Sequence, residues 1–427
     1  MVKTVATLAL LLVTLPLNLA LTAVALLRSL VIRPPRAVAA DPKTILISGG
    51  KMTKALALAR SFHRAGHRVV LVEARKYRLT GHRFSRAVDR FYTVPEPMHP
   101  GYVAALVEIV RREAVDVYVP VCSPVASQYD AHAAAALPCE VVHVDPATAR
   151  QLDDKHAFAV AATALGLPVP DTHRITDPQQ VIDFDFGARP RPYILKSIAY
   201  DPVRRLDLTR LPRATPAETA AFARALPISE DNPWILQEFV TGQEYCTHST
   251  VRDGHVQLHC CCESSAFQIN YAMVEQPEIE AWVRRFVAAH ELTGQVSFDF
   301  IRSDTGALYA IECNPRTHSA ITMFYDHPDV ARAYLEDGVA EIRPTAASRP
   351  TYWLYHELWR LVTRPGVARL KTIARGKDAI FDWADPLPFL MVHHAQIPSL
   401  LLDNLRHGKG WMRIDFNIGK LVEAAGD

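Results

Sequence analysis

A long run of apolar residues near the amino terminus is the first pattern that the chain shows. It covers residues 5–27, and a few less apolar residues interrupt it, among them Thr14, Pro16, Asn18 and Thr22. A helix of this length and composition can cross the hydrocarbon core of a bilayer. One basic residue precedes the run and three follow it: Lys3, then Arg28, Arg33 and Arg36. The excess of positive charge after the run predicts that the rest of the chain lies on the cytoplasmic side.

A cleaved signal peptide is the alternative interpretation of the same segment. Ala37-Val38-Ala39 resembles a small-residue cleavage site. The apolar run is longer than the usual core of a signal peptide, however, which favours a transmembrane helix. We therefore expect residues 1–40 to be a hydrophobic segment and its linker. This segment would anchor a cytoplasmic body to the inner face of the cell membrane.

Strand and helix patterns alternate between residues 41 and 150. Residues 44–48 are apolar and β-branched, and they predict a strand that ends at Gly49-Gly50. A helix follows, with apolar residues at helical spacing: Ala55, Leu58, Ala59 and Phe62. Further strands are expected at residues 69–72, 115–119 and 141–144, and a further helix around residues 103–110. This order predicts a parallel sheet with helices on its faces.

The pattern changes near Gln151 to one typical of an α+β unit, which we expect over residues 151–342. A helix should begin near Asp153 or Asp154 and end before Gly166, and strands are expected at residues 191–198 and 233–240. Asp253-Gly254 predicts a hairpin between strands at residues 249–252 and 255–261. A second hairpin should join residues 295–301 to residues 308–313. Residues 343–427 are aromatic-rich and should form a C-terminal extension packed on the rest.

Length, charge and cysteine content narrow the class of protein. A chain of 427 residues is too long for one compact core and predicts two or three domains. The formal net charge is +2, from 47 basic and 45 acidic residues, so nucleic acid is not an expected partner. The 7 cysteines are an odd number without paired spacing, which indicates reduced thiols.

The second hairpin carries a group of residues suited to bind a divalent cation. Alternation along its strands places one set of side chains on a single face: Ser297, Asp299, Glu312 and Asn314. The opposite face then carries apolar packing: Phe298, Phe300, Ile311 and Cys313. Mg²⁺ prefers few protein carboxylates and completes its shell with phosphate and water oxygens. The alternative is a solvated face of an edge hairpin.

Other segments supply groups that suit a nucleotide. Arg316 can stabilise charge on a transferred phosphoryl group, and Lys196 and Lys155 can hold phosphates, Lys155 at the start of a helix. Backbone groups of an extended linker can contact an adenine edge, and a carboxylate can accept from ribose hydroxyls. The candidates for these two roles are Gln237, Glu238, Phe239 and Val240, followed by Glu244.

The order of these motifs resembles that of ATP-grasp ligases, over about residues 41–326. The motifs are Asp154-Lys155, Ile194-Leu195-Lys196, Gln237-Glu238-Phe239-Val240 with Glu244, Asp299-Phe300, and Glu312-Cys313-Asn314-Pro315-Arg316. The resemblance implies a Rossmann-like pre-ATP-grasp domain over residues 41–150 and two lobes that grip ATP over residues 151–342. It also implies that Asp299, Glu312 and Asn314 bind Mg²⁺ (or Mn²⁺) and that Arg316 faces the reacting phosphate.

Five segments are similar to mycosporine-glycine synthases: residues 47–56, 119–127, 200–206, 314–320 and 414–420. This similarity implies condensation of 4-deoxygadusol with glycine, driven by ATP. Two positions depart from the wider family pattern. Ser297 occupies a position where related amino-acid ligases often carry Arg, and residues 199–208 lack the glycines of a typical phosphate lid but contain Arg204 and Arg205. These two arginines either close over the phosphates or are solvated.

The implied chemistry also needs an unprotonated amine, for which His318 is the candidate base, with a structural loop histidine as the alternative. Two further functions stay open at this point. One is an ATP-grasp ligase that joins an amine to another small acid. The other is a membrane-tethered nucleotide-binding protein without turnover.

Overall fold

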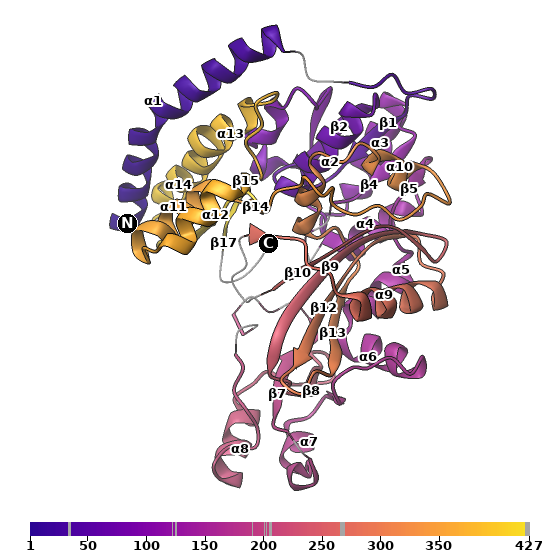
Figure 1. Ribbon diagram of the computed structural model, residues 1–427. Helices are drawn as coiled ribbons and strands as arrows, with labels where there is room; N and C mark the ends of the chain where they lie inside the picture. Colours follow the sequence, from indigo (N-terminus) through magenta and orange to yellow (C-terminus); the bar gives the residue numbers. More distant parts are fainter. Residues whose placement is uncertain are drawn as a thin grey trace.

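The computed structural model describes residues 1–32, 36–121, 123, 126–189, 191–199, 201, 203–204, 207–264 and 270–422. The amino-terminal sheet and the carboxyl-terminal helices share one half of the molecule, and two antiparallel sheets extend from the other half (Figure 1). The long helix α1 (Val2–Val31) runs along the outside of the carboxyl-terminal helices.

A five-stranded parallel sheet forms the amino-terminal unit, in the order β3-β2-β1-β4-β5. Its strands are β1 (Thr44–Ile47), β2 (Arg68–Ala74), β3 (Arg90–Val94), β4 (Val117–Val119) and β5 (Glu140–Val141). Its helices are α2 (Thr53–Arg64), α3 (Tyr102–Glu113) and α4 (Ala126–Ala134), with short 3₁₀ turns η1 (Arg75–Tyr77) and η2 (Gly81–Phe84). The predicted parallel β-α-β order is confirmed. Strand β3 was not predicted, because most of its side chains are exposed or half-buried and it lacks an apolar run.

Two antiparallel sheets form the second unit. One has the order β6-β8-β7, with β6 (Thr172–Ile175), β7 (Tyr193–Ser197) and β8 (Trp234–Glu238). The other has the order β10-β9-β12-β13, with β9 (Gly242–Arg252), β10 (His255–Glu263), β12 (Gly294–Ser303) and β13 (Leu308–Asn314). The associated helices are α5 (Pro146–Asp153), α6 (Lys155–Ala164), α7 (Pro178–Ile182), η3 (Phe186–Ala188), α8 (Pro216–Arg224) and α9 (Pro277–Ala289). Both predicted hairpins are present at the expected residues.

Helices α6 and α9 cover one face of the four-stranded sheet with aromatic side chains. Phe158 of α6 and Trp282 and Phe286 of α9 contact Phe298 of β12, with ring centroids 5.2–6.1 Å apart. Trp282 also meets Phe300 at 5.3 Å. This buried layer fixes the orientation of β12, so the side chains on its other face point away from the core.

The carboxyl-terminal region packs on the amino-terminal unit through short strands and helices. Its elements are η4 (Ser319–Phe324), α10 (Val330–Leu335), β14 (Thr351–Tyr352), α11 (Leu354–Thr363), α12 (Val367–Arg375), β15 (Lys377–Asp378), α13 (Leu387–Met391), η5 (Val392–Gln396), α14 (Ile397–Arg406), β16 (Arg413–Asp415) and β17 (Lys420–Val422). Strand β11 (Asn270–Tyr271) joins β14 and β15 in a small sheet. Buried Trp353 donates from Nε1 to Thr53 Oγ1 of α2 at 3.0 Å.

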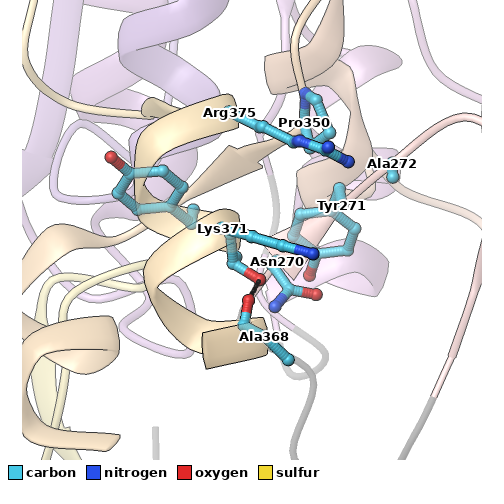
Figure 2. A pocket seen from close by; sticks show the side chains of 9 residues that line it. Asn270, Tyr271, Ala272, Pro350, Ala368, Lys371 and Arg375 are labelled. Atoms are coloured by element: carbon cyan, nitrogen blue, oxygen red, sulfur yellow. Dashed lines mark hydrogen bonds between the residues drawn. The ribbon is translucent and has the colours of Figure 1, made fainter. Parts of the chain in front are cut away.

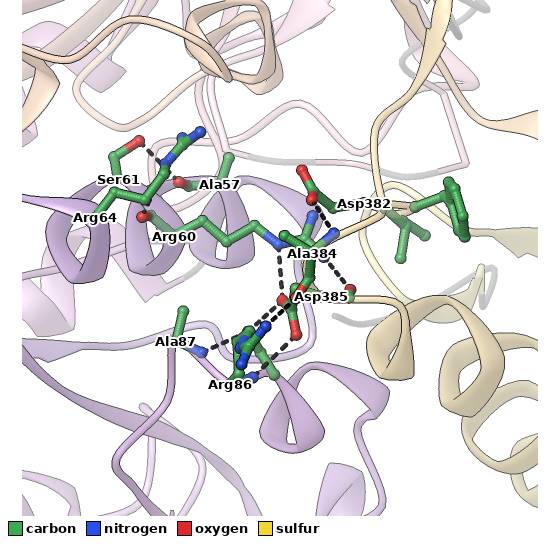
Figure 3. A network of polar contacts seen from close by, with 12 residues as sticks. Ala57, Arg60, Ser61, Arg64, Arg86, Ala87, Asp382, Ala384 and Asp385 are labelled. Carbon is green, nitrogen blue, oxygen red and sulfur yellow. Dashed lines mark hydrogen bonds and ion pairs between the residues drawn. The ribbon is translucent and has the colours of Figure 1, made fainter. Parts of the chain in front are cut away.

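A polar network also ties this region to the amino-terminal unit (Figure 3). The buried Asp385 carboxylate accepts from Arg60 Nε at 2.9 Å, from Ser85 Oγ at 2.5 Å and from the Arg86 backbone N–H at 2.9 Å. Arg60 and Arg86 also donate to the backbone carbonyls of Asp385 and Ala384. Because Asp385 lies some 300 residues after its partners, the network joins two distant parts of the chain.

Replacement of this carboxylate should destabilise the fold. Asp385→Ala leaves the half-buried Arg60 guanidinium, the Ser85 hydroxyl and an N–H group without their acceptor, so we expect the free energy of unfolding to fall by about 3 kcal/mol. Urea unfolding monitored by tryptophan fluorescence measures this change. Asp403→Ala is the matched control, since Asp403 is exposed and its carboxylate meets the exposed His407 at 3.4 Å, and it should cost about 0.5 kcal/mol. Equal losses in the two variants would contradict the role of the network.

Candidate functional site

Three oxygen-bearing side chains meet on the face of β12 and β13 that points away from the aromatic core. Asp299 is opposite Glu312, and Ser297 is opposite Asn314, in the antiparallel register of the two strands. Asn314 Nδ2 lies 3.4 Å from Asp299 Oδ2 and 3.4 Å from Glu312 Oε1. The alternation pattern predicts this grouping. The fourth residue that it places on the same face, Ser297, is buried, and its hydroxyl makes no hydrogen bond within the part of the chain that the structure describes.

A β-bulge corrects one part of the predicted hairpin. The register shifts after Asp299, so that Phe300 pairs with Ala310 and Ile311 is the extra residue. Ala310 is therefore buried with Phe298, Phe300 and Cys313, and Ile311 is only half-buried. The prediction that Ile311 belongs to the packed layer was wrong, because strict alternation assumes a regular ladder.

Three cations surround the carboxylates. Lys155 Nζ lies 3.8 Å from Glu312 Oε2, at the start of α6, where Asp154 caps the helix by accepting from the N–H groups of His156 and Ala157. Arg316 donates to Asn314 Oδ1 and lies 3.4 Å from Asp153 Oδ1. Lys196, on β7, donates to Gln237 Oε1 of β8 at 3.1 Å. Two lobes thus contribute positive charge: the three-stranded sheet through Lys196, and α6 and β13 through Lys155 and Arg316.

The electrostatics of the carboxylate pair fit a divalent cation. Burial, followed by the charge of Glu312, raises the pKa of Asp299 well above its ordinary value. Burial opposes ionisation of Glu312 too, but Lys155, a hydrogen bond with Asp299, Lys196 and Arg316 together lower its pKa. Two adjacent carboxyl groups repel each other when both are ionised, and the charge of a divalent cation would offset that repulsion. Among the described residues no three His, Cys, Asp or Glu side chains form a metal cluster, so such a cation would need other ligands, which the phosphates of a nucleotide supply.

The predicted linker lies between the two antiparallel sheets. The backbone N–H groups of Glu238 and Phe239 donate to Asp171 and Pro192 carbonyls, at 2.8 and 2.7 Å. The Glu238 carboxylate meets Arg191 at 3.2 Å, and Arg210 stacks over Phe239 at 4.7 Å. Val240 is buried and Glu244, on β9, is exposed. These contacts fix the linker from Gln237 to Val240 at the edge next to Lys196.

The structure gives the remaining candidates other surroundings. Arg204 is exposed and pairs with Asp201 at 3.1 Å, rather than with any of the site carboxylates, and Arg205 lies outside the described residues. His318 Nδ1 accepts the backbone N–H of Ala320 at 3.2 Å and so caps η4. Its ring meets Tyr271 edge-on at 5.4 Å. The cap uses Nδ1 of His318, and the same side chain also meets the Cys246 thiol.

Two neighbours of the site were not selected from the sequence. Asp153, the last residue of α5, holds Arg316, and burial raises the pKa of this carboxyl although Arg316 opposes the shift. Its position directly before Asp154-Lys155 is the only signal that could have indicated it. Cys246 lies opposite Asp299 in the register of β9 and β12. A hydrogen bond from Cys262 lowers the pKa of the Cys246 thiol, although burial opposes the shift, and no pattern in the sequence indicates this pairing.

A separate pocket of about 370 Å³ lies between α12 and β11. Figure 2 shows Lys371 of α12 extending toward Asn270 and Tyr271, and Arg375 of α12 extending toward Pro350 and Ala272. None of the carboxylates described above lines this pocket. Its lining residue Tyr271 meets His318 edge-on at the boundary between the pocket and the candidate site. We therefore assign the candidate site to the β12–β13 face and not to this pocket.

Comparison with known proteins gives similarity in structure only. No protein-family model matches the chain, and no curated protein sequence does so either. An ADP complex of N5-carboxyaminoimidazole ribonucleotide synthetase matches with a TM-score of 0.55 and 16% identity, over 77% of this chain and 87% of that one. The Staphylococcus aureus N5-carboxyaminoimidazole synthetase with ADP matches at 0.53 and 14%, over 74% and 82%.

A larger enzyme shares the same core. Pyruvate carboxylase from Rhizobium etli matches with a TM-score of 0.55 and 18% identity, over 70% of this chain but only 30% of that one. The chain therefore spans less than a third of the length of that carboxylase. At such low identities the matches show a common fold, which agrees with the order of sheets and motifs described above. This chain has the ATP-grasp fold, preceded by a long apolar helix.

Proposed function

We propose that this chain is an ATP-dependent ligase that forms a C–N bond and uses ATP with Mg²⁺. The observation that carries the proposal is the group formed by Asp299, Glu312 and Asn314, with Lys155 and Arg316 in contact with it. Solved structures of the same fold include ADP complexes and an L-amino acid ligase from Bacillus licheniformis, which matches at a TM-score of 0.50 and 16% identity. A protein that only tethers a nucleotide would not need this complete arrangement.

Each residue has a defined part in the proposed reaction. Asp299, Glu312 and Asn314 would hold Mg²⁺, which when bound neutralises the triphosphate. Lys155 and Lys196 bind phosphate oxygens, and Arg316 stabilises the charge that develops on the transferred phosphoryl group. The linker from Gln237 to Val240 contacts adenine through its backbone, and Glu244 accepts from ribose. We keep Arg204 and Arg205 as candidates for closure over the phosphates.

For the substrates we propose 4-deoxygadusol and glycine, on the basis of the sequence similarities. An enolised 1,3-dicarbonyl behaves as a vinylogous carboxylic acid. Its enol oxygen attacks the γ-phosphorus, the bond to the leaving ADP oxygen breaks, and an enol phosphate forms. The glycine nitrogen then attacks the carbon that bears the phosphate, phosphate leaves with the C–O electron pair, and nitrogen loses a proton. His318, which follows Arg316 by two residues, is our candidate acceptor of that proton.

Product analysis tests this assignment. Purified protein is incubated with ATP, Mg²⁺, 4-deoxygadusol and each amino acid in turn, and ADP and product mass are measured. The expected result is ADP release that requires both 4-deoxygadusol and glycine. ADP release with a different acid and amine would keep the ligase and overturn the substrates. Tight ATP binding without ADP release under all conditions would overturn the ligase itself.

The phosphate role of Lys196 gives a binding prediction. Lys196→Ala removes a half-buried cation. Burial lowers the pKa of this lysine, so contact with a phosphate group would stabilise its charged form. We expect the Kd for ADP with Mg²⁺ to rise roughly 30-fold, as for one charge-assisted contact. Isothermal titration calorimetry measures it. Lys371→Ala, which removes a lysine from the separate pocket, should leave the Kd unchanged. An unchanged Kd in Lys196→Ala would contradict the phosphate assignment.

A further inference from the structure

We propose that α1, α11 and α12 form a surface that binds the face of an anionic lipid bilayer, with α1 lying along the membrane instead of crossing it. The three helices gather on one side of the molecule, away from β12 and β13 (Figure 1). This inference stands independently of the ligase reaction, because it uses residues outside the candidate site.

Specific contacts hold α1 against the protein. Asn18 donates to Tyr355 OH at 2.7 Å and meets His394 Nε2 at 2.7 Å, and Tyr355 OH donates to Thr14 Oγ1 at 2.9 Å. Leu11 and Ala25 are buried in the same interface. Crossing a bilayer would remove all of these partners from Asn18, and an unpaired amide in hydrocarbon is costly. The helix is long and apolar enough to span, but its polar residues are used for packing.

The outer face of α1 stays apolar and uncovered. Val13, Leu17 and Leu27 are 75%, 71% and 63% exposed. Further exposed apolar residues lie along the whole helix: Val5, Leu10, Leu12, Leu19, Val24, Leu26, Leu30 and Val31. A contiguous apolar stripe of this length on a protein surface marks an interaction site.

The α11–α12 hairpin, which lies beside α1, also exposes apolar side chains. Trp359 is 61% exposed and Val362 is 76% exposed on α11, and Val367 and Leu370 are exposed on α12. The first turn of α11 contacts α1 through Tyr355, so the two apolar surfaces adjoin. Tryptophan and aliphatic residues on short helices are typical of segments that lie at the headgroup level of a membrane.

The positive charge of the α11–α12 hairpin favours an anionic bilayer as the partner of this surface. Residues 354–375 carry five basic residues and one acidic residue, although the whole chain has a net charge of only +2. The acidic residue, Glu357, is buried, whereas Arg364 is exposed on the hairpin, and Lys371 and Arg375 are exposed at the pocket beside β11. A second copy of the chain is a poorer partner, because a two-fold contact would place this basic hairpin against itself. Acidic headgroups complement it.

Vesicle flotation tests the proposal with the full chain. We expect the protein to float with vesicles that contain phosphatidylserine and to float several-fold less with phosphatidylcholine alone. Trp359→Glu with Val362→Glu should reduce the bound fraction at least roughly tenfold, because each charge would enter the interface. Val160→Glu is the matched control, since Val160 is 55% exposed on α6, in the other part of the molecule. It should bind as the unchanged chain does.

A second measurement tests whether the α11–α12 hairpin touches the membrane, in case α1 alone is sufficient for vesicle binding. Trp359 fluorescence should be quenched by lipids brominated near the headgroup, and Trp359→Phe should lose most of that quenching. Equal flotation of the hairpin variant and the Val160→Glu control, without quenching of Trp359, would mean that α1 spans the bilayer and would overturn the proposal. A concentration-dependent dimer that fails to bind vesicles would overturn it in favour of a second copy.

Discussion

Glu312→Gln should reduce ADP release at saturating ATP roughly 1,000-fold, which corresponds to about 4 kcal/mol of transition-state stabilisation. Glu312 faces Asp299 across the hairpin and meets Lys155 at 3.8 Å, so it joins the proposed metal site to the phosphate-binding cation. The glutamine keeps the shape and one oxygen but removes the charge that a divalent cation needs. Steady-state ADP release measured with a coupled assay gives the change in kcat.

The fold of this variant should be intact. Glu312→Gln loses a long, partly exposed ion pair with Lys155, at 3.8 Å, and relieves the repulsion from Asp299, so the change in the free energy of unfolding should be small. Asp304→Asn is the matched control, because Asp304 lies in the exposed turn of the same hairpin, where its carboxylate accepts from Thr241 Oγ1 at 2.9 Å. It should retain full activity. Full turnover by a folded Glu312→Gln variant would refute the metal assignment.

Local patterns were sufficient to predict the strands that carry this site. Asp253-Gly254 and the turn before Leu308 set hairpin positions, and Asp299 and Glu312 then share a face because side chains alternate. The bulge at Ile311 could not be predicted in this way. The bulge places Ala310 in the buried aromatic cluster, where its neighbours lie on other elements.

Long-range contacts account for most of what the sequence did not reveal. Nothing in the sequence indicates that Asn18 meets Tyr355 and His394. The apolar amino terminus therefore suggested a membrane-spanning segment, because only its composition could be considered. The pairing of Arg204 with Asp201, three residues earlier, is a local contact that the sequence did not reveal either. Burial and partner identity depend on tertiary packing, which a single sequence does not specify.

Arg316→Ala should reduce ADP release roughly 300-fold, as loss of one preorganised donor to a charged transition state does. Arg316 contacts Asn314 Oδ1 and Asp153 Oδ1, so its guanidinium is held at the end of β13, next to the proposed metal ligands.

Two companion variants separate charge from position in this prediction. Arg316→Lys retains the charge but cannot contact both partners at once, so we expect it to recover only part of the activity. Asp153→Asn keeps an acceptor for Arg316 and removes only a charge, so its loss should be about tenfold and should appear in kcat more than in KM, because Asp153 acts through Arg316. Equal activity of Arg316→Ala and the unchanged chain would mean that Arg316 only packs against Asp153, and the phosphoryl group would then need a different cation.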